Sequence, residues 1–502
     1  MLGHGRIVVS SRLRTVPNPL RWLLLSVGYL LARLGVIAPQ RVERTTDLAW
    51  PRIVTGLARM SKSAADVAMV GIALGPAAIA GVGLATPYWG LAFGISGGIA
   101  GATISLVSQR YTGGTVRDLS LAVTTCALVT AAIMLPLGVL YGTVPEWLIG
   151  LVGNDAASIA YGTDYLRVLA LGVPFAGLNL IGSRTLVGAD DAWTPMMLRA
   201  GGAVVNVAIN AVLIFVLEMG VVGAAIGTVV ANVLVLTAFV VGFTTGRLPV
   251  IGEFPVTLDL EWPPVTRADV RDVLSIGTPL VFTNGARRAA QFPMLAIVAL
   301  FGPNVLAAYV VARRVRDLMD TPGWGFSLAS SSLVGQELGT GDERSADTYG
   351  REVLWFGTGV YLISATIVFV FAEQVGRVFV DDPSILPLVT TFIAVACVSV
   401  VFRGISGGAT GPLRASGDTN WPFYGQALGL YVFAIPVAYL GAAAVPVPGL
   451  EAATPLGIGA LYAALVLETL VPAVVTYYRF ETGSWKVISR SYRPESGSSP
   501  GD

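Results

Sequence analysis

LVSQRYTGG, at residues 106–114, recurs as LVGQELGTG at residues 333–341, and this repetition decides the fold. A second pair of stretches, GADDAWTPM at 188–196 and ASGDTNWPF at 415–423, is separated by the same 227 residues. Self-similarity at one fixed offset is the signature of a duplicated architecture. We therefore predict two related halves.

Both halves are built from apolar stretches that are long enough to cross a membrane. The chain is 54% hydrophobic and 13% charged, with a mean hydropathy of +0.71, which lies outside the range of soluble domains. A bilayer core needs about 20 apolar residues per helix. The twelve predicted spans lie near 52–74, 77–108, 118–141, 164–188, 195–216, 220–243, 272–300, 304–335, 351–372, 386–412, 420–442 and 454–478. The predicted fold is an all-α integral membrane protein with two six-helix bundles.

Six spans per half make both halves begin on the same side of the membrane. The repeat is then parallel, with a pseudo-two-fold axis along the membrane normal. Two such bundles can rock and expose a central cavity to each side in turn, which is the basis of secondary transport. A duplicated structural scaffold is the alternative. Prolines inside spans, such as Pro174 and Pro322, are predicted to kink them.

The loop arginines predict the orientation. A cytoplasmic N-terminus leaves only Arg377 in the outer loops, as expected because Lys and Arg gather in cytoplasmic loops. Both termini are therefore predicted to be cytoplasmic. Residues 20–39 are nearly long enough to span, but basic flanks favour an interfacial helix over an extra span or a signal peptide. The predicted divisions are 1–50, a basic N-terminal segment; 51–244, the first bundle; 245–270, a cytoplasmic linker; 271–480, the second bundle; and 481–502, a polar tail.

Composition also argues against several other classes of function. The net charge of +1 suggests no nucleic-acid partner. Cys126 and Cys397 lie in apolar stretches, so no disulfide is expected, and His4 is the single histidine. No P-loop is present, and no nucleophile or metal constellation supports a membrane enzyme or a channel over a transporter. We expect small-molecule substrates, no cofactor and a monomer in the lipid bilayer.

Several short motifs, taken in order, resemble a known transporter family. DVAMVG at 66–71 ends the first span, NVAIN occupies 206–210 in the fifth, and LRASGDT at 413–419 follows the tenth. From about residue 52 to residue 486 the chain resembles the MATE (multidrug and toxic compound extrusion) transporters, in particular a prokaryotic, DinF-like branch. The resemblance implies a cation-coupled antiporter of the cell membrane that exports amphipathic, mostly cationic compounds against inward Na⁺ or H⁺.

The resemblance also implies where the cation couples. In that branch an Asp on the first helix faces polar residues of helices four to six, and these positions correspond to Asp66, Asn206 and Thr228, with Asn179 as a further candidate. Asn210 departs from the pattern, because many relatives have a second Asp there, and this puts tight Na⁺ binding in doubt.

The residue types themselves allow two interpretations of this group. Amide and hydroxyl oxygens of Asn206, Asn210 and Thr228 are hard ligands that suit Na⁺ beside Asp66, but they equally suit interhelical hydrogen bonds. A carboxylate near mid-bilayer costs about 2.5 to 3.5 kcal/mol on insertion scales, so Asp66 is expected to have a task, such as carrying a proton. The alternative is that it only pairs with Lys62, one turn earlier.

The second half carries different charges. The counterpart of Asp66 is Pro293, whereas the seventh and eighth spans contain arginines and acids. This possible second site or cavity network comprises Glu468, Arg287, Arg288, Arg313, Asp317 and Asp320. The i,i+4 pairs Arg313/Asp317 and Arg316/Asp320 are predicted to neutralise each other, with Glu468 as a partner of one arginine or a second proton site. Arginines that bind an anionic substrate or phosphate, as in a lipid or lipid-linked oligosaccharide flippase of the same superfamily, are the rival hypothesis.

Overall fold

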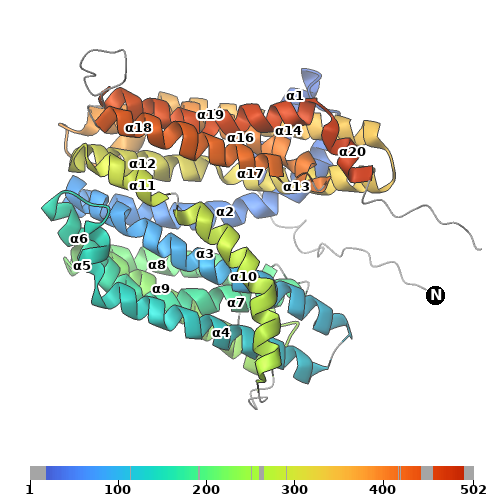
Figure 1. The fold of residues 1–502 in the computed structure, drawn as a ribbon, viewed down its shortest axis with the longest axis horizontal. Coiled ribbons are helices and arrows are strands. Elements are labelled where there is room, and N and C mark those ends of the chain that lie inside the picture. Colours follow the sequence, from blue (N-terminus) through green and yellow to red (C-terminus); the bar gives the residue numbers. More distant parts are fainter. Residues whose placement is uncertain are drawn as a thin grey trace, which may run out of the picture.

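The computed structural model describes residues 19–490, apart from 114, 190, 192, 250, 259–264, 290, 417, 419 and 443–455. The described residues are mostly helical, and the helices form two stacked layers (Figure 1). The first half of the chain contributes α1 (Pro19–Arg33), α2 (Pro39–Leu74), α3 (Pro76–Gly113), α4 (Val116–Thr143), α5 (Pro145–Gly150), α6 (Ala156–Leu169), α7 (Val173–Gly188), α8 (Trp193–Ala211) and α9 (Gly220–Thr245). Between the halves, β1 (Arg247–Leu248) pairs with β2 (Gly252–Glu253) as an antiparallel hairpin.

The second half forms the other layer. It contributes α10 (Arg267–Ala289), α11 (Gln291–Ala299), α12 (Pro303–Met319), α13 (Thr321–Gly339), α14 (Glu343–Val370), α15 (Ala372–Arg377), α16 (Leu386–Ala415), α17 (Asn420–Ala427), α18 (Ile435–Ala442), α19 (Ile458–Glu481) and α20 (Ser484–Arg490). A 3-10 turn joins α6 to α7, and π-helical turns follow α8 and join α17 to α18.

Nine stretches of the described chain are long and apolar enough to cross a membrane, and they coincide with nine of the twelve predicted spans. The other three predicted spans correspond to α2, to α10 with α11, and to α12 with α13. These spans carry several of the intramembrane charges, among them Asp66 and Asp320, which lower their hydropathy. Figure 1 shows α2 between the two layers, so charge is concentrated near the interface of the halves.

Two of the predicted kinks are present. The helix of the fourth span is interrupted at 170–172 by a 3-10 turn, directly before Pro174. The eighth predicted span, 304–335, is two helices, because α12 ends at Met319 and α13 begins at Thr321 with Pro322 in its first turn. Proline is accepted in the first turn of a helix but cannot donate to the preceding one.

The halves exchange their first helices. The first helix of the first half, α2, packs on α13 of the second half, and α10, the first helix of the second half, packs chiefly on α3 of the first. In Figure 1, α10 crosses the layer of first-half helices. The duplicated sequence therefore produces a reciprocal contact on each side of the pseudo-axis.

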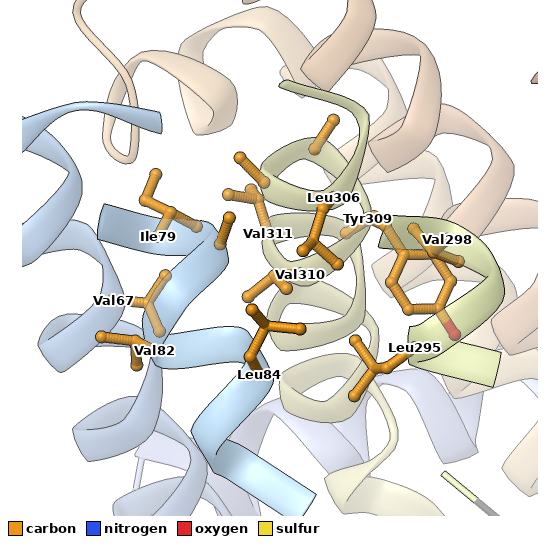
Figure 2. Packing of buried hydrophobic residues seen from close by; sticks show 14 of the residues in the cluster. Val67, Ile79, Val82, Leu84, Leu295, Val298, Leu306, Tyr309, Val310 and Val311 are labelled. Atoms are coloured by element: carbon orange, nitrogen blue, oxygen red, sulfur yellow. The ribbon is translucent and has the colours of Figure 1, made fainter. Parts of the chain in front are cut away.

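An apolar seam joins the halves where α2 turns into α3 and α11 into α12. Figure 2 shows Leu84 of α3 next to Val310 of α12 in the same buried cluster. At Gly83 a side chain would collide with Val310, so the absence of a Cβ atom allows this close approach. Seams of small residues are usual between membrane helices, since van der Waals packing drives their association.

The N-terminal helix α1 packs on α2 and α14. Gly28 lies directly against Val42 and Phe356, and the Arg21 and Asp47 side chains pair at 2.7 Å. Whether α1 lies in the interface remains a prediction.

Candidate functional site

Four of the predicted coupling residues meet inside the first bundle. Asp66 of α2 is 7% exposed, and Asn206, Asn210 and Thr228 are buried as well. The Asn210 amide donates to Asp66 Oδ1 at 2.7 Å and lies 3.4 Å from Asn206 Oδ1. The Asn206 amide donates to the Thr228 hydroxyl at 3.2 Å. The spacing of the two asparagines along α8 places both on one helix face, from which they link α2 to α9.

Lys62 lies in the same group. Its ammonium is 3.2 Å from Asp66 Oδ2 and 3.4 Å from the Thr228 hydroxyl oxygen. The pairing with Asp66 was the alternative considered from sequence, but the second contact, with a residue of α9, was not predicted. A fixed positive charge therefore contacts two of the oxygens that a bound Na⁺ would need.

Asn179 lies one step away from this group. Its amide donates to the side chain and the backbone carbonyl of Asn232 at 3.1 and 2.9 Å, and the Asn232 amide donates to the Thr228 carbonyl at 2.8 Å. Asn179 thus belongs to an extension of the network on α7 and α9. Sequence reasoning missed Asn232, although it follows Thr228 by one helical turn.

In the second bundle, Glu468 forms a buried ion pair. The two terminal nitrogens of Arg316 each lie 3.2 Å from a Glu468 oxygen, and Arg316 is 2% exposed. Arg316 Nη1 also reaches the Ser399 hydroxyl at 3.5 Å. The bidentate pair ties α12, α16 and α19 together, so of the two predicted roles Glu468 has that of an arginine partner.

The predicted i,i+4 pair between Arg316 and Asp320 is wrong, because both residues have partners on other helices. Asp320 pairs with Arg403 of α16 at 3.0 Å and accepts a hydrogen bond from the Tyr361 hydroxyl at 2.8 Å. Asp320 follows the last residue of α12, where the helix is interrupted. The Asp320 carboxylate is engaged by residues of α14 and α16 rather than by its i−4 neighbour.

Other charged residues predicted in the second half contact polar or small residues. Arg313 donates to the Tyr309 hydroxyl at 3.3 Å rather than to Asp317, so the other predicted i,i+4 pair is also absent. Arg314 donates to Thr86 of α3 at 2.7 Å, across the two halves. The Arg288 side chain lies against Gly90 of α3. The side chain of Arg287 lies outside the described residues.

A further set of arginines, which sequence reasoning did not single out, converges between the layers. The basic cluster consists of Arg52 and Arg59 of α2, Arg184 of α7 and Arg199 of α8. Arg59 lies within electrostatic range of Arg288 of α10, and also of Arg52 and Arg184. Arg199 lies within range of the other three members of the cluster. Four charges from three helices come together only in the fold, so no local motif could have predicted them.

Comparison with known proteins adds independent findings. The family model described as MatE matches residues 51–212 and 279–440. The chain is 26% identical to "Probable multidrug resistance protein NorM" of Bradyrhizobium diazoefficiens, over 80% of this chain and 87% of that protein. It is 25% identical to "Multidrug resistance protein PmpM" of Pseudomonas aeruginosa, over 81% and 85%. Its fold is similar, with a TM-score of 0.74 and 20% identity, to a solved inward-facing multidrug resistance MATE family transporter, covering 87% of this chain and 96% of that one.

Proposed function

The chain belongs to the MatE family, and on that premise we propose that it is a proton-coupled multidrug antiporter of the cell membrane, with both termini in the cytoplasm. Relatives named multidrug resistance proteins support export as the task. The apolar helices of spanning length and the two duplicated halves support alternating access as the mechanism. The group around Asp66 is the observation that carries the coupling.

The position of Lys62 favours a proton over Na⁺ as the coupling ion. Na⁺ requires several oxygen ligands, and Asp66 and Thr228 would be among them. The ammonium of Lys62 already contacts both. A sodium ion bound between the same oxygens would lie beside a like charge, with little water to screen the repulsion. The presence of Asn210 in place of a second carboxylate lowers the negative charge further.

A proton acts on this group through the Lys62–Asp66 ion pair. When Asp66 takes up a proton, its carboxylate becomes neutral and no longer attracts the ammonium, which keeps only the Thr228 contact on α9. The hydrogen bond from Asn210 to Asp66 weakens for the same reason, because a bond to a charged acceptor is the stronger one. Protonation therefore loosens α2 from α8, and α2 is the helix that also packs on the other half.

The cargo is proposed to be amphipathic small molecules. The resemblance alone leads to cationic compounds, but the basic cluster favours cargo of the opposite charge. For the same reason a lipid or lipid-linked flippase is the second candidate, since guanidinium groups suit phosphate.

The test is transport in proteoliposomes, with a pH gradient and a Na⁺ gradient imposed separately. Export is measured for one fluorescent organic cation and one fluorescent organic anion, so that the result does not depend on the sign of the cargo. We expect the pH gradient alone to drive export, Asp66→Asn to abolish it, and Asp164→Asn, at an exposed acid of α6, to leave it unchanged. Export driven by Na⁺ alone, or full activity of a correctly inserted Asp66→Asn protein, would refute the proposed coupling.

A further inference from the structure

Within the described part of the chain, the four arginines of the basic cluster have no acidic partner in direct contact, although Arg59, Arg184 and Arg199 are half-buried. Among the described residues, none of Arg52, Arg59, Arg184 and Arg199 forms an ion pair or a hydrogen bond through its side chain. Arg59 Nε is buried without an acceptor. By contrast, Arg316 and Arg403 of the second bundle are each paired with a carboxylate. The positive charge of the basic cluster is therefore not neutralised by a direct ion pair with any described residue.

Two aromatic rings flank the deepest member of the cluster. The Arg59 guanidinium carbon lies 4.6 Å from the centroid of the Trp324 ring on α13 and 5.8 Å from that of Phe93 on α3. These contacts hold the guanidinium by cation–π attraction but supply no hydrogen-bond acceptor. Since Trp324 belongs to the second half and Arg59 to the first, the two halves meet at this point.

The arginines are spread along the membrane normal. Arg184 lies about one turn before the end of α7, and Arg199 lies in the second turn of α8, both near the end of the bundle that is predicted to face the cytoplasm. Arg59 lies about 10 Å along α2 from Arg52, at a rise of 1.5 Å per residue. A row of like charges leading inward attracts counter-charged solutes and raises their local concentration.

Among the described residues, the acid whose charge acts on Arg59 is Asp317 of α12. It has no ion pair or hydrogen bond of its own among the described residues. One carboxylate cannot balance the charge of four guanidinium groups, so the site has a net positive charge. Binding of an anion would reduce the repulsion between the arginines. Local rules are broken in this way chiefly at functional sites.

We propose that the basic cluster binds an anionic amphipathic substrate, with a carboxylate, sulfonate or phosphate group on the arginines and an apolar body against Trp324 and Phe93. A guanidinium matches the geometry of such groups with two parallel hydrogen bonds. Aromatic faces accept apolar or aromatic bodies. This inference rests on the proposed export function and specifies its cargo.

The test compares two dyes that share a xanthene ring system, anionic carboxyfluorescein and cationic rhodamine 123. Binding to the purified full-length protein is measured by fluorescence polarisation, without any gradient. We expect wild type to prefer carboxyfluorescein, and Arg59→Gln to weaken its binding about tenfold or more, because a hydrogen bond to a charged group is lost. Arg199→Gln should weaken it as well, whereas Arg167→Gln, at an exposed arginine of α6, should change it less than about twofold.

The melting temperature of each variant shows whether weaker binding results from unfolding. Arg59→Lys is a second control, because it keeps the charge and should retain part of the affinity for carboxyfluorescein. A preference for rhodamine 123, or unchanged carboxyfluorescein binding by folded Arg59→Gln and Arg199→Gln, overturns the proposal.

Competition identifies the source of the anion. If dihexanoyl phosphatidic acid displaces carboxyfluorescein at a far lower concentration than inorganic phosphate does, the natural ligand group is a lipid headgroup. If both displace it at comparable concentrations, the natural ligand is a free anion. Displacement by neither overturns the site. Because binding is measured without a gradient, it does not require proton coupling. Intact binding without gradient-driven transport therefore rejects the proposed coupling alone, and proton-driven rhodamine export without anion binding rejects the site alone.

Discussion

The buried pair of Arg316 and Glu468 allows a quantitative prediction. The perturbations are Arg316→Met, Glu468→Leu and the double variant. Removing one partner of a buried pair leaves an uncompensated charge and costs about 3–5 kcal/mol of unfolding free energy, whereas apolar replacement of both is often neutral. Arg316 is 2% exposed and contacts both carboxylate oxygens, so the upper part of that range applies. Each single variant should be less stable than the double variant.

The assay is denaturant unfolding of the purified protein in detergent, followed by tryptophan fluorescence. The surface pair Arg351–Glu481, at 2.7 Å with partly exposed side chains, is the matched control, for which each single substitution should cost less than about 1 kcal/mol. The coupling follows from the cycle of four proteins.

Two results would refute this reasoning. If the double variant loses the sum of the two single losses, the residues are not coupled. If Glu468→Gln keeps its stability but loses proton-driven export, Glu468 is a second proton site rather than a structural partner.

Three further changes test other parts of the structure. Gly83→Val should destabilise the protein by about 1–3 kcal/mol, because its side chain collides with Val310 at the seam; an unchanged melting temperature would show that the seam is looser than described. Tyr361→Phe removes the 2.8 Å hydrogen bond to Asp320 and should lower the free energy of unfolding by about 1.5–3 kcal/mol in the same assay. An unchanged free energy of unfolding would show that this hydrogen bond does not stabilise the protein. Lys62→Gln should create stabilisation by Na⁺ relative to K⁺ at equal ionic strength in a thermal-shift measurement, and Na⁺-specific stabilisation of wild type would contradict the role given to the ammonium.

The fold was predictable where one physical signal dominates. Apolar length alone predicts the nine spans that the structure bears out, and the constant offset of the turns predicts two related halves. Pro322 was the only sequence signal for the interruption between α12 and α13. This signal is weak, because a proline permits a helix break without requiring one. The exchange of α2 and α10 leaves no trace in hydropathy, since it depends on which helix faces which.

The candidate site was predictable where its residues share a helix or a family motif. Asn206 and Asn210 are one turn apart, and the resemblance added Asp66 and Thr228. Local spacing misled for Asp320, whose carboxylate pairs with Arg403 of another helix. Non-local charges such as the basic cluster depend on the packing of several helices, which no spacing rule describes.

The exchange of first helices has a consequence for biogenesis. The ribosome completes α2 long before α13 exists, and α2 carries Lys62, Asp66 and four arginines. Synthesis from Leu74 to Thr321 takes roughly 10 to 50 s at typical translation rates. During this time the helix lacks its final neighbour, and each charge that faces lipid is costly. The nascent chain must therefore hold this helix in the insertion machinery, or against other first-half helices, until its partner is made.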